Sequence, residues 1–282
     1  MNRVHVLFLL LACVRPVAPE QAPDEQLFQS AELSRTPNAE VRRLLSSPSA
    51  PVRTRAALAA GRIADPEAVP RLALLAREDD TAAWALGRIE TDRDALVACL
   101  PRPACARALG GKNAVIDALL DALPEPEAAF ALGVTARNKD AKFPPRTWAA
   151  LSSALPRIPA AAAYALSRLP KGEPVRGLEA ALHSADPWTR SLAARAWGHQ
   201  GLPASGLEGA FDDPDWRVRV EAARGLPTAP GAAESFVKIL PRQTSEHVLT
   251  ALFEAAVQIG PAVLDALLRI PCTAALARDR IR

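Results

Sequence analysis

The most regular feature of the sequence is a short string of small and apolar residues that ends at a glycine. Residues 56–61 read Ala-Ala-Leu-Ala-Ala-Gly, and we call the last residue of the string the reference position. Related strings end at Gly87, Gly110, Gly133, Ser167, Gly198 and Gly225, and a weaker one lies at 251–260. Alanine stands two residues before each of these seven clear reference positions. Most copies carry a second alanine or a cysteine five residues before the reference position, and because the two small residues are three apart, they share one helix face. The pattern predicts a series of helices whose small-residue face lets a neighbour pack closely.

Proline and glycine mark the expected ends of these helices. Prolines stand near the expected first turn at Pro51, Pro103, Pro126, Pro159, Pro187 and Pro214, where a missing N–H costs nothing. Glycine at the reference position is expected to end the helix in the left-handed conformation. Between the copies, residues 66–76 and 114–123 carry apolar residues at helical spacing and predict second helices. Alternating helices and turns, with reference positions 23 residues apart (Gly87 to Gly110) or more, are typical of a stacked array.

Composition agrees with a helical chain. The 282 residues include 59 alanines, the strongest helix former, but only 7 phenylalanines and 1 tyrosine, so an all-β protein is excluded. An apolar fraction of 49% also excludes a disordered chain. A net charge of +3 over this length is too small for the basic surface that nucleic-acid-binding proteins carry, so we expect no nucleic-acid partner.

Two strings of the sequence resemble a known repeat family. Pro51-Val52-Arg53 before Gly61, and Asp213-Pro214-Asp215-Trp216-Arg217 before Gly225, resemble HEAT repeats, above all the short HEAT-like type found in phycobilin lyases and many bacterial proteins. The family usually has an arginine eight residues before the reference position, as at Arg53, Arg102, Arg190 and Arg217; the copies ending at Gly87 and Gly133 depart from this with Asp79 and Glu125. The resemblance implies an all-α fold, an α-α superhelix (α-solenoid) of about nine short helix pairs over residues 30–282. It says little about function, because packing residues define the family.

The N-terminus reads as a targeting segment. Residues 1–12 hold one basic residue and then an apolar run too short to span a bilayer, as in a signal peptide. Leu10-Leu11-Ala12-Cys13 resembles the bacterial lipobox, which implies cleavage before Cys13 and lipidation of that cysteine; Val14 after it is the pattern of outer-membrane sorting. Alternatively, Cys13 is an ordinary residue of a soluble signal peptide or of an intracellular N-terminus. Residues 13–29 are rich in proline and predict an extended tether.

Motifs for catalysis or metal binding are not found in the sequence. The histidines after the signal, His183, His199 and His247, fall in different repeats without ligand spacing, so we expect no active site, metal or cofactor. Cys99 and Cys105 flank a turn-like stretch and are compatible with a disulfide in an oxidising compartment. We favour free thiols, because Cys105 occupies a slot that is alanine elsewhere and a buried thiol acts as a small hydrophobe.

A second helix face is the candidate binding surface. Positions six and three before the reference position and one after it line one face, next to the alanine face. We call this face the stripe, and its candidate binding residues are Arg55, Arg62, Trp84, Arg88, Arg107, Phe130, Tyr164, Arg168, Arg195, His199 and Arg219. Arginine and aromatic residues are enriched at interface hot spots, so the stripe predicts a groove for an acidic or extended polypeptide. The alternative is that the aromatic residues pack between repeats and the arginines are solvated. Trp188 and Trp216 are expected to cap neighbouring repeats rather than to form an exposed ridge.

These observations favour a non-catalytic protein-binding scaffold in the cell envelope. The expected location is the outer membrane, facing the periplasm, with the lipid as the only membrane contact; a soluble periplasmic or a cytoplasmic protein is the alternative. Two other functions stay open, the accessory arm of a peptidyl-prolyl isomerase-like system and a lyase-like tetrapyrrole chaperone. Neither the partner nor the oligomeric state follows from the sequence.

Overall fold

The structure is helical throughout the part of the chain that it describes. This computed structural model describes residues 23–89 and 93–268, apart from the side chains of residues 23, 114, 266 and 268, and within these ranges it contains no strand. The expected all-α class is therefore confirmed. The chain divides into two compact units, Met1–Asp92 and Arg93–Arg282.

The first unit consists of helices that pack around α3. Its elements are α1 (Pro23–Ser34), α2 (Ala39–Leu44), α3 (Ala50–Ile63), the 3-10 turn η1 (Pro66–Ala68), α4 (Val69–Leu75) and α5 (Asp80–Ile89). Helices α1 and α2 pack against α3, and α3 and α4 pack against α5. Residues 23–29 were expected to belong to an extended tether, but they form the first turns of α1. The reason is Phe28, which is 2% exposed and packs into this unit. The predicted signal peptide, Cys13 and the rest of the tether lie outside the described residues.

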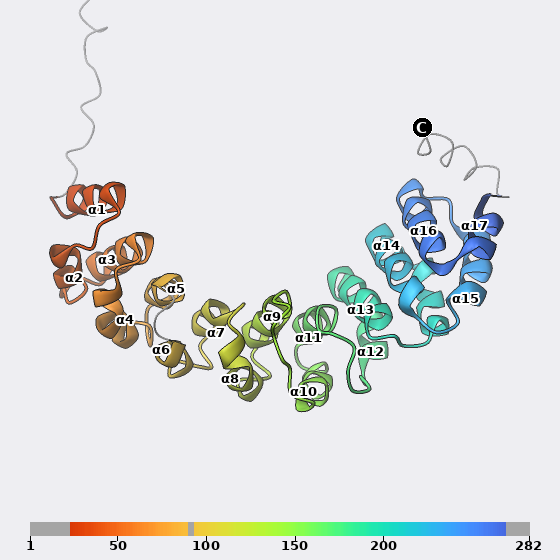
Figure 1. Ribbon diagram of the computed structural model, residues 1–282, viewed down its shortest axis with the longest axis horizontal. Helices are drawn as coiled ribbons and strands as arrows, with labels where there is room; N and C mark the ends of the chain where they lie inside the picture. Colours follow the sequence, from red (N-terminus) through yellow and green to blue (C-terminus); the bar gives the residue numbers. More distant parts are fainter. Residues whose placement is uncertain (1–22, 90–92, 269–282) are drawn as a thin grey trace, which may run out of the picture. The chain divides into compact units, whose positions relative to one another are not determined.

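The second unit consists of two rows of helices (Figure 1). Its elements are α6 (Arg93–Val97), α7 (Pro103–Leu109), η2 (Asn113–Val115), α8 (Ile116–Asp121), α9 (Pro126–Thr135), α10 (Arg146–Ala154), α11 (Pro159–Leu166), α12 (Leu178–Leu182), α13 (Pro187–His199), η3 (Ala204–Asp212), α14 (Trp216–Gly225), η4 (Leu226–Thr228), α15 (Ala232–Ile239), η5 (Leu240–Arg242), α16 (Glu246–Ile259) and α17 (Pro261–Leu268). Helices α7, α9, α11, α13, α14 and α16 contain or adjoin the reference positions and each packs against the next, so we call them the reference row. Helices α6, α8, α10 and α12, the second row, each pack against the reference helix that follows them in the chain.

The core is made of alanines at the helix contacts and of larger residues beside them. The positions two and five before the reference position are buried in both units, except for the half-buried Ala108. Leucine stands directly before the reference position in several copies, and Leu109, Leu132 and Leu166 are fully buried. Towards the end of the second unit, Phe211 and Phe236 are fully buried and fill the space between η3 and α15. The predicted small-residue face is therefore the packing face.

Glycine at the reference position has a different role from the one expected. Gly61, Gly133 and Gly198 lie inside helices α3, α9 and α13 instead of ending them. A Cβ atom on Gly198 would lie 2.1 Å from the carbonyl oxygen of Gly225, so only glycine allows α13 and α14 to approach this closely. The expectation of a helix stop is therefore wrong for these three glycines, and at Gly198 the neighbouring helix requires the glycine. Helices α7 and α14 do end directly before Gly110 and at Gly225, but these glycines have φ values of −55° and −77° and are not left-handed.

Proline marks the helix starts as predicted in most copies. Pro103, Pro126, Pro159 and Pro187 are each the first residue of a helix. Pro214 is the exception, since α14 begins two residues later, at Trp216. This later start changes the register of α14, with consequences for its arginines described below.

Candidate functional site

The predicted stripe forms a chain of contacts across three consecutive helices of the second unit. An Nη atom of Arg107, on α7, lies 3.0 Å from a carboxylate oxygen of Glu127, on α9. One turn further along α9, Phe130 packs against Tyr164 of α11, with ring centroids 5.3 Å apart. The guanidinium of Arg168 then lies 5.5 Å from the centroid of the Tyr164 ring, a cation–π arrangement. The structure thus joins Phe130, Tyr164 and Arg168 directly, and Arg107 adjoins them through Glu127, one turn before Phe130 on α9.

The aromatic residues of this contact chain also serve the packing between helices. A Cβ atom on Gly133 would lie 2.6 Å from Cε1 of Tyr164, so the tyrosine ring rests directly on the glycine backbone of α9. Phe130 and Tyr164 are half-buried, which leaves part of each ring open to solvent. The stripe therefore combines both interpretations made from the sequence: the rings pack between repeats and still present apolar surface.

Further along the row, the stripe residues are already engaged with the protein. Arg195 on α13 lies 2.9 Å from a carboxylate oxygen of Glu221 on α14. A ring nitrogen of His199 lies 2.8 Å from the carbonyl oxygen of Leu169. Arg219 donates to the carbonyl oxygens of Asp213 and Pro214 and so holds the turn before α14.

The assignment of Arg219 to the binding surface is therefore corrected. Helix α14 begins at Trp216 behind its N-cap Asp215, and counting from this cap puts Arg219 at the place that Arg190 has in α13. Arg190 likewise donates to the carbonyl oxygens of Ser184 and Ala185. Arg219, and not Arg217, is thus the structural arginine of this repeat.

In the first unit, helix α1 occupies part of the predicted stripe. Arg55 pairs with Glu25 at 2.9 Å and with Glu32 at 2.5 Å, and its guanidinium lies 4.8 Å from the centroid of Phe28. The bond from Arg55 holds the pKa of Glu25 below its ordinary value. Arg62 lies 2.8 Å from the other oxygen of Glu32. Arg55 is thus removed from any open groove and fastens α1 to α3, which is a correction to its predicted role.

Trp84 and Arg88 of the first unit stay accessible. Trp84 is 41% exposed although one edge of its ring covers Gly61. Arg88 is exposed and lines a cleft of about 520 Å³ together with Glu32, Leu33 and Arg62.

Carboxylates from neighbouring helices neutralise most of the stripe arginines. Glu25 and Glu32 pair with the first two arginines, Glu127 with Arg107 and Glu221 with Arg195. These partners are not evident from the sequence pattern because they lie 20 or more residues away in the chain. A strongly basic groove is therefore not present on these helices, and what the stripe presents is aromatic and guanidinium surface of nearly balanced charge.

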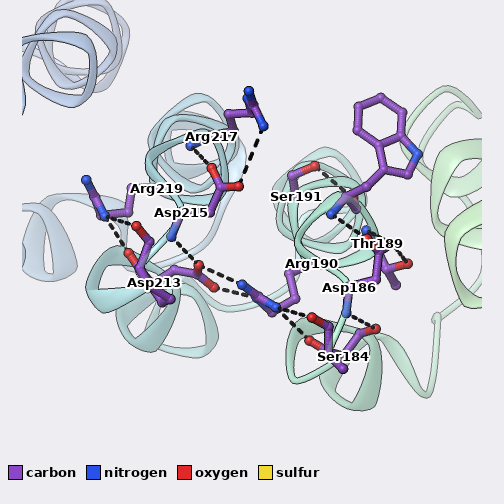
Figure 2. A network of polar contacts seen from close by, with 12 residues as sticks. Ser184, Asp186, Thr189, Arg190, Ser191, Asp213, Asp215, Arg217 and Arg219 are labelled. Carbon is purple, nitrogen blue, oxygen red and sulfur yellow. Dashed lines mark hydrogen bonds and ion pairs between the residues drawn. The ribbon is translucent and has the colours of Figure 1, made fainter.

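A polar network joins the N-terminal ends of α13 and α14 (Figure 2). Arg190 makes two bonds to the carboxylate of Asp213, at 2.6 and 2.9 Å, and both side chains are largely buried, at 14% and 8% exposed. Asp186 caps α13 by accepting from the backbone N–H of Thr189 at 2.9 Å and from its hydroxyl at 2.7 Å. The backbone N–H of Asp215 donates to Asp213 at 2.8 Å. The two helix starts are thus locked together by charge-assisted bonds.

Two carboxylates of this network, Asp213 and Asp186, ionise more readily than usual. Burial raises the pKa of Asp213, but the bonds from Arg190 and from the backbone N–H of Asp215 outweigh it, so the pKa lies below its ordinary value. The hydroxyl and the backbone N–H of Thr189 lower the pKa of Asp186. Neither group is held protonated near neutral pH, and their role here is structural.

Two tryptophans beside this network keep much of their side chains exposed. Trp188 is 60% exposed and Trp216 is 41% exposed. Trp216 packs against His247 of α16, with ring centroids 4.7 Å apart, and the guanidinium of Arg217 lies 5.6 Å from the centroid of its ring. The expected capping role is wrong for Trp188, because at the second position of α13 it lies at the helix edge and not between helices.

The two central cysteines are bonded to each other. Cys99, just after α6, and Cys105, on α7, form a disulfide with their Cα atoms 6.0 Å apart. The preference for free thiols is therefore corrected. Cys105 does lie at the buried small-residue position, but the turn before α7 brings Cys99 within bonding range of it. Cys272 lies outside the described residues.

Comparison with known proteins adds no identity. No protein-family model matches the chain, and no curated protein matches it. In the described part of the chain, no group of three or more His, Cys, Asp or Glu side chains is placed to hold a metal ion. None of the helices within residues 23–89 and 93–268 is long and apolar enough to cross a membrane.

Proposed function

We propose that the chain is an exported, non-catalytic scaffold that binds a partner polypeptide along the stripe of its reference row. In this proposal the helix pairs form a HEAT-like α-solenoid, and Cys13 carries a lipid that anchors the protein in the outer membrane. The contact chain from Arg107 through Phe130 and Tyr164 to Arg168 is the observation that carries the proposal. It supports binding because it offers aromatic and guanidinium surface, continuous over three helices and partly open to solvent.

The balanced charge of the stripe favours one kind of partner over another. An acidic polypeptide would need free guanidinium groups, and Arg107 and Arg195 are already paired with carboxylates. An extended polypeptide can instead lie across the Phe130 and Tyr164 rings, and its backbone carbonyl oxygens can accept hydrogen bonds from Arg168. Since the helices hold these side chains in place before binding, little conformational entropy is lost, and modest contacts suffice.

The disulfide supports the export part of the proposal. Disulfides persist in oxidising compartments and are rare in the cytosol of most organisms. The Cys99–Cys105 bond therefore favours an exported chain over the cytoplasmic alternative.

Site-specific photo-crosslinking in cells tests the binding surface. We would place p-benzoylphenylalanine at Val134, an exposed position of the stripe on α9, and at Ala149, an exposed position of α10 in the second row. A partner on the stripe is expected to give a discrete adduct from position 134 and none from position 149. Tyr164→Ala with Arg168→Ala should then lower the adduct yield at position 134, whereas Arg157→Ala, an exposed arginine outside the stripe, should not.

Three results would count against this function. Equal adducts from positions 134 and 149 would indicate non-specific contact. No adduct from position 134 or from other exposed stripe positions would remove the binding surface. An adduct that survives the change at Tyr164 and Arg168, in a protein with normal far-UV circular dichroism, would remove the proposed recognition residues.

A further inference from the structure

A separate cleft lies between α6 and α8, in the second row of helices. It is open to solvent and has a volume of about 630 Å³, within the range of sites that hold small ligands. Most of its lining is apolar and includes Val97, Leu100, Ala118 and Leu123, all of which are only half-buried. The cleft shares no residue with the stripe, so its function is independent of the one proposed above.

The charge around this cleft has one sign. Asp121 and Glu125 are the charged side chains among the described residues that line it. Glu125 lies with one oxygen 3.5 Å from the backbone N–H of Glu127 at the start of α9, where it acts as the N-cap. Asp121 lies 2.8 Å from Arg146, which also pairs with Asp117 at 2.7 Å. Two carboxylates therefore share the guanidinium of Arg146, and Glu125 adds a third negative charge, so the rim keeps an excess of negative charge.

One wall of the cleft is fixed covalently. Leu100 and Pro101 line the cleft and lie between Cys99 and Cys105, inside the loop that the disulfide closes. Both cysteines are buried, which anchors the two ends of this loop in the packed interior. A wall that is ordered before binding loses little conformational entropy when a ligand arrives.

We propose that this cleft binds an apolar peptide segment that carries a lysine or arginine. Apolar side chains of the segment lie on Val97, Leu100 and Leu123, which removes their exposed surface from water. Its cation lies at the rim near Asp121 and Glu125, where the excess of negative charge is complementary. The occupant is thus defined by two features together, an apolar stretch and a positive charge.

Fluorescence anisotropy with matched peptides tests this site on the full-length, oxidised protein. The probe is a labelled peptide Ser-Leu-Leu-Lys-Leu-Ser, and its control has glutamate in place of lysine. The lysine peptide is expected to bind, and the glutamate peptide to bind at least tenfold more weakly, because it places a negative charge at a negative rim.

Variants of the rim make the test specific to the carboxylates. Asp121→Asn with Glu125→Gln removes two charges and keeps the oxygen that caps α9, and it should weaken the lysine peptide about threefold to tenfold, since each exposed ion pair accounts for a factor of about five at most. The matched control, Asp140→Asn with Glu173→Gln, changes the net charge equally at two exposed positions away from the cleft and should have no effect. Arg146→Met should act in the opposite direction and strengthen binding, because it frees Asp121.

The apolar floor and the fixed wall are tested in the same assay. Ala118→Trp fills the cleft and should abolish binding of the lysine peptide. Cys99→Ser with Cys105→Ser should weaken binding several-fold; if that variant does not fold, the rim variants decide alone. The proposal is overturned if the wild-type protein does not bind the lysine peptide, or if the rim variant and its control, both with native circular dichroism, bind it equally well.

Discussion

The close contact between α13 and α14 makes a quantitative prediction about Gly198. In Gly198→Ala, the new Cβ would lie 2.1 Å from the carbonyl oxygen and 2.2 Å from the Cα of Gly225. Ordinary contacts of this kind begin near 3.4 Å, so the two helices must separate by more than 1 Å. Both clashing atoms belong to the backbone, and no side-chain rotation relieves them.

The size of the effect follows from two opposing contributions. Overpacking of a close-packed contact costs about 1 to 3 kcal/mol, and a rigid backbone contact lies at the upper end. Alanine is favoured over glycine inside a helix by about 1 kcal/mol, which offsets part of the cost. We therefore expect Gly198→Ala to lower the free energy of unfolding by about 2 kcal/mol and the melting temperature by about 4 to 8 °C.

Gly209 provides the matched control. A Cβ at this exposed position of η3 would meet nothing within 4 Å, so Gly209→Ala should change the free energy of unfolding by less than about 0.5 kcal/mol. Urea titration followed by circular dichroism measures both variants. If Gly198→Ala is as stable as Gly209→Ala, or more stable than the wild type, the glycine is not a packing requirement and the reasoning about the reference positions fails.

Three further predictions concern the network, the disulfide and the N-terminus. Because the pKa of Asp213 is lowered in the folded protein, its contribution to stability is present above about pH 4 and is lost as the pH falls through its folded pKa. The urea midpoint of the wild type should therefore fall between about pH 6 and pH 3, and it should fall less in Asp213→Asn. An equal fall in the two proteins would contradict this. Cys99→Ser with Cys105→Ser should lower the free energy of unfolding by about 2 kcal/mol, as expected for so short a closed loop. In wild-type protein that is denatured without a reducing agent, maleimide should label neither Cys99 nor Cys105. Cys13→Ser should abolish incorporation of a labelled fatty acid; label that persists in this variant would exclude lipidation at Cys13.

The helical fold follows from the sequence because its signal is local. An alanine pair three residues apart needs only its own helix to define a face, and the buried Ala128 and Ala131 of α9 lie on the predicted packing face. The proline signal is local as well, which is why Pro159 marks the start of α11 correctly. Glycine is ambiguous in sequence: Gly198 has the pattern of a helix stop, but the neighbouring Gly225 determines its role.

The candidate site was predicted less completely because its chemistry depends on distant partners. The stripe was found from spacing alone, and Phe130 and Tyr164 do meet across α9 and α11. The neutralisation of Arg55 was not predictable, because it depends on Glu25, which lies 30 residues earlier. Glu25 lies on α1, where the proline content had predicted an extended tether. The role of Arg219 was missed for another reason, a two-residue change of register that only the start of α14 reveals.

The direction of the ion pairs limits how this gene can have grown or can be recombined. In the pairs Arg107–Glu127, Arg190–Asp213 and Arg195–Glu221, the cation belongs to one repeat and the anion to the repeat after it. At these three contacts a repeat is matched to its successor, whereas Arg146 pairs with Asp117 and Asp121 of the repeat before it. Excising or duplicating the module of α13 or of α14 would leave a largely buried Arg190 or Asp213 facing an unsuitable neighbour. A shortened version that keeps both members of each pair should fold better than one cut between them, which gives protein engineers a rule for where this chain can be divided.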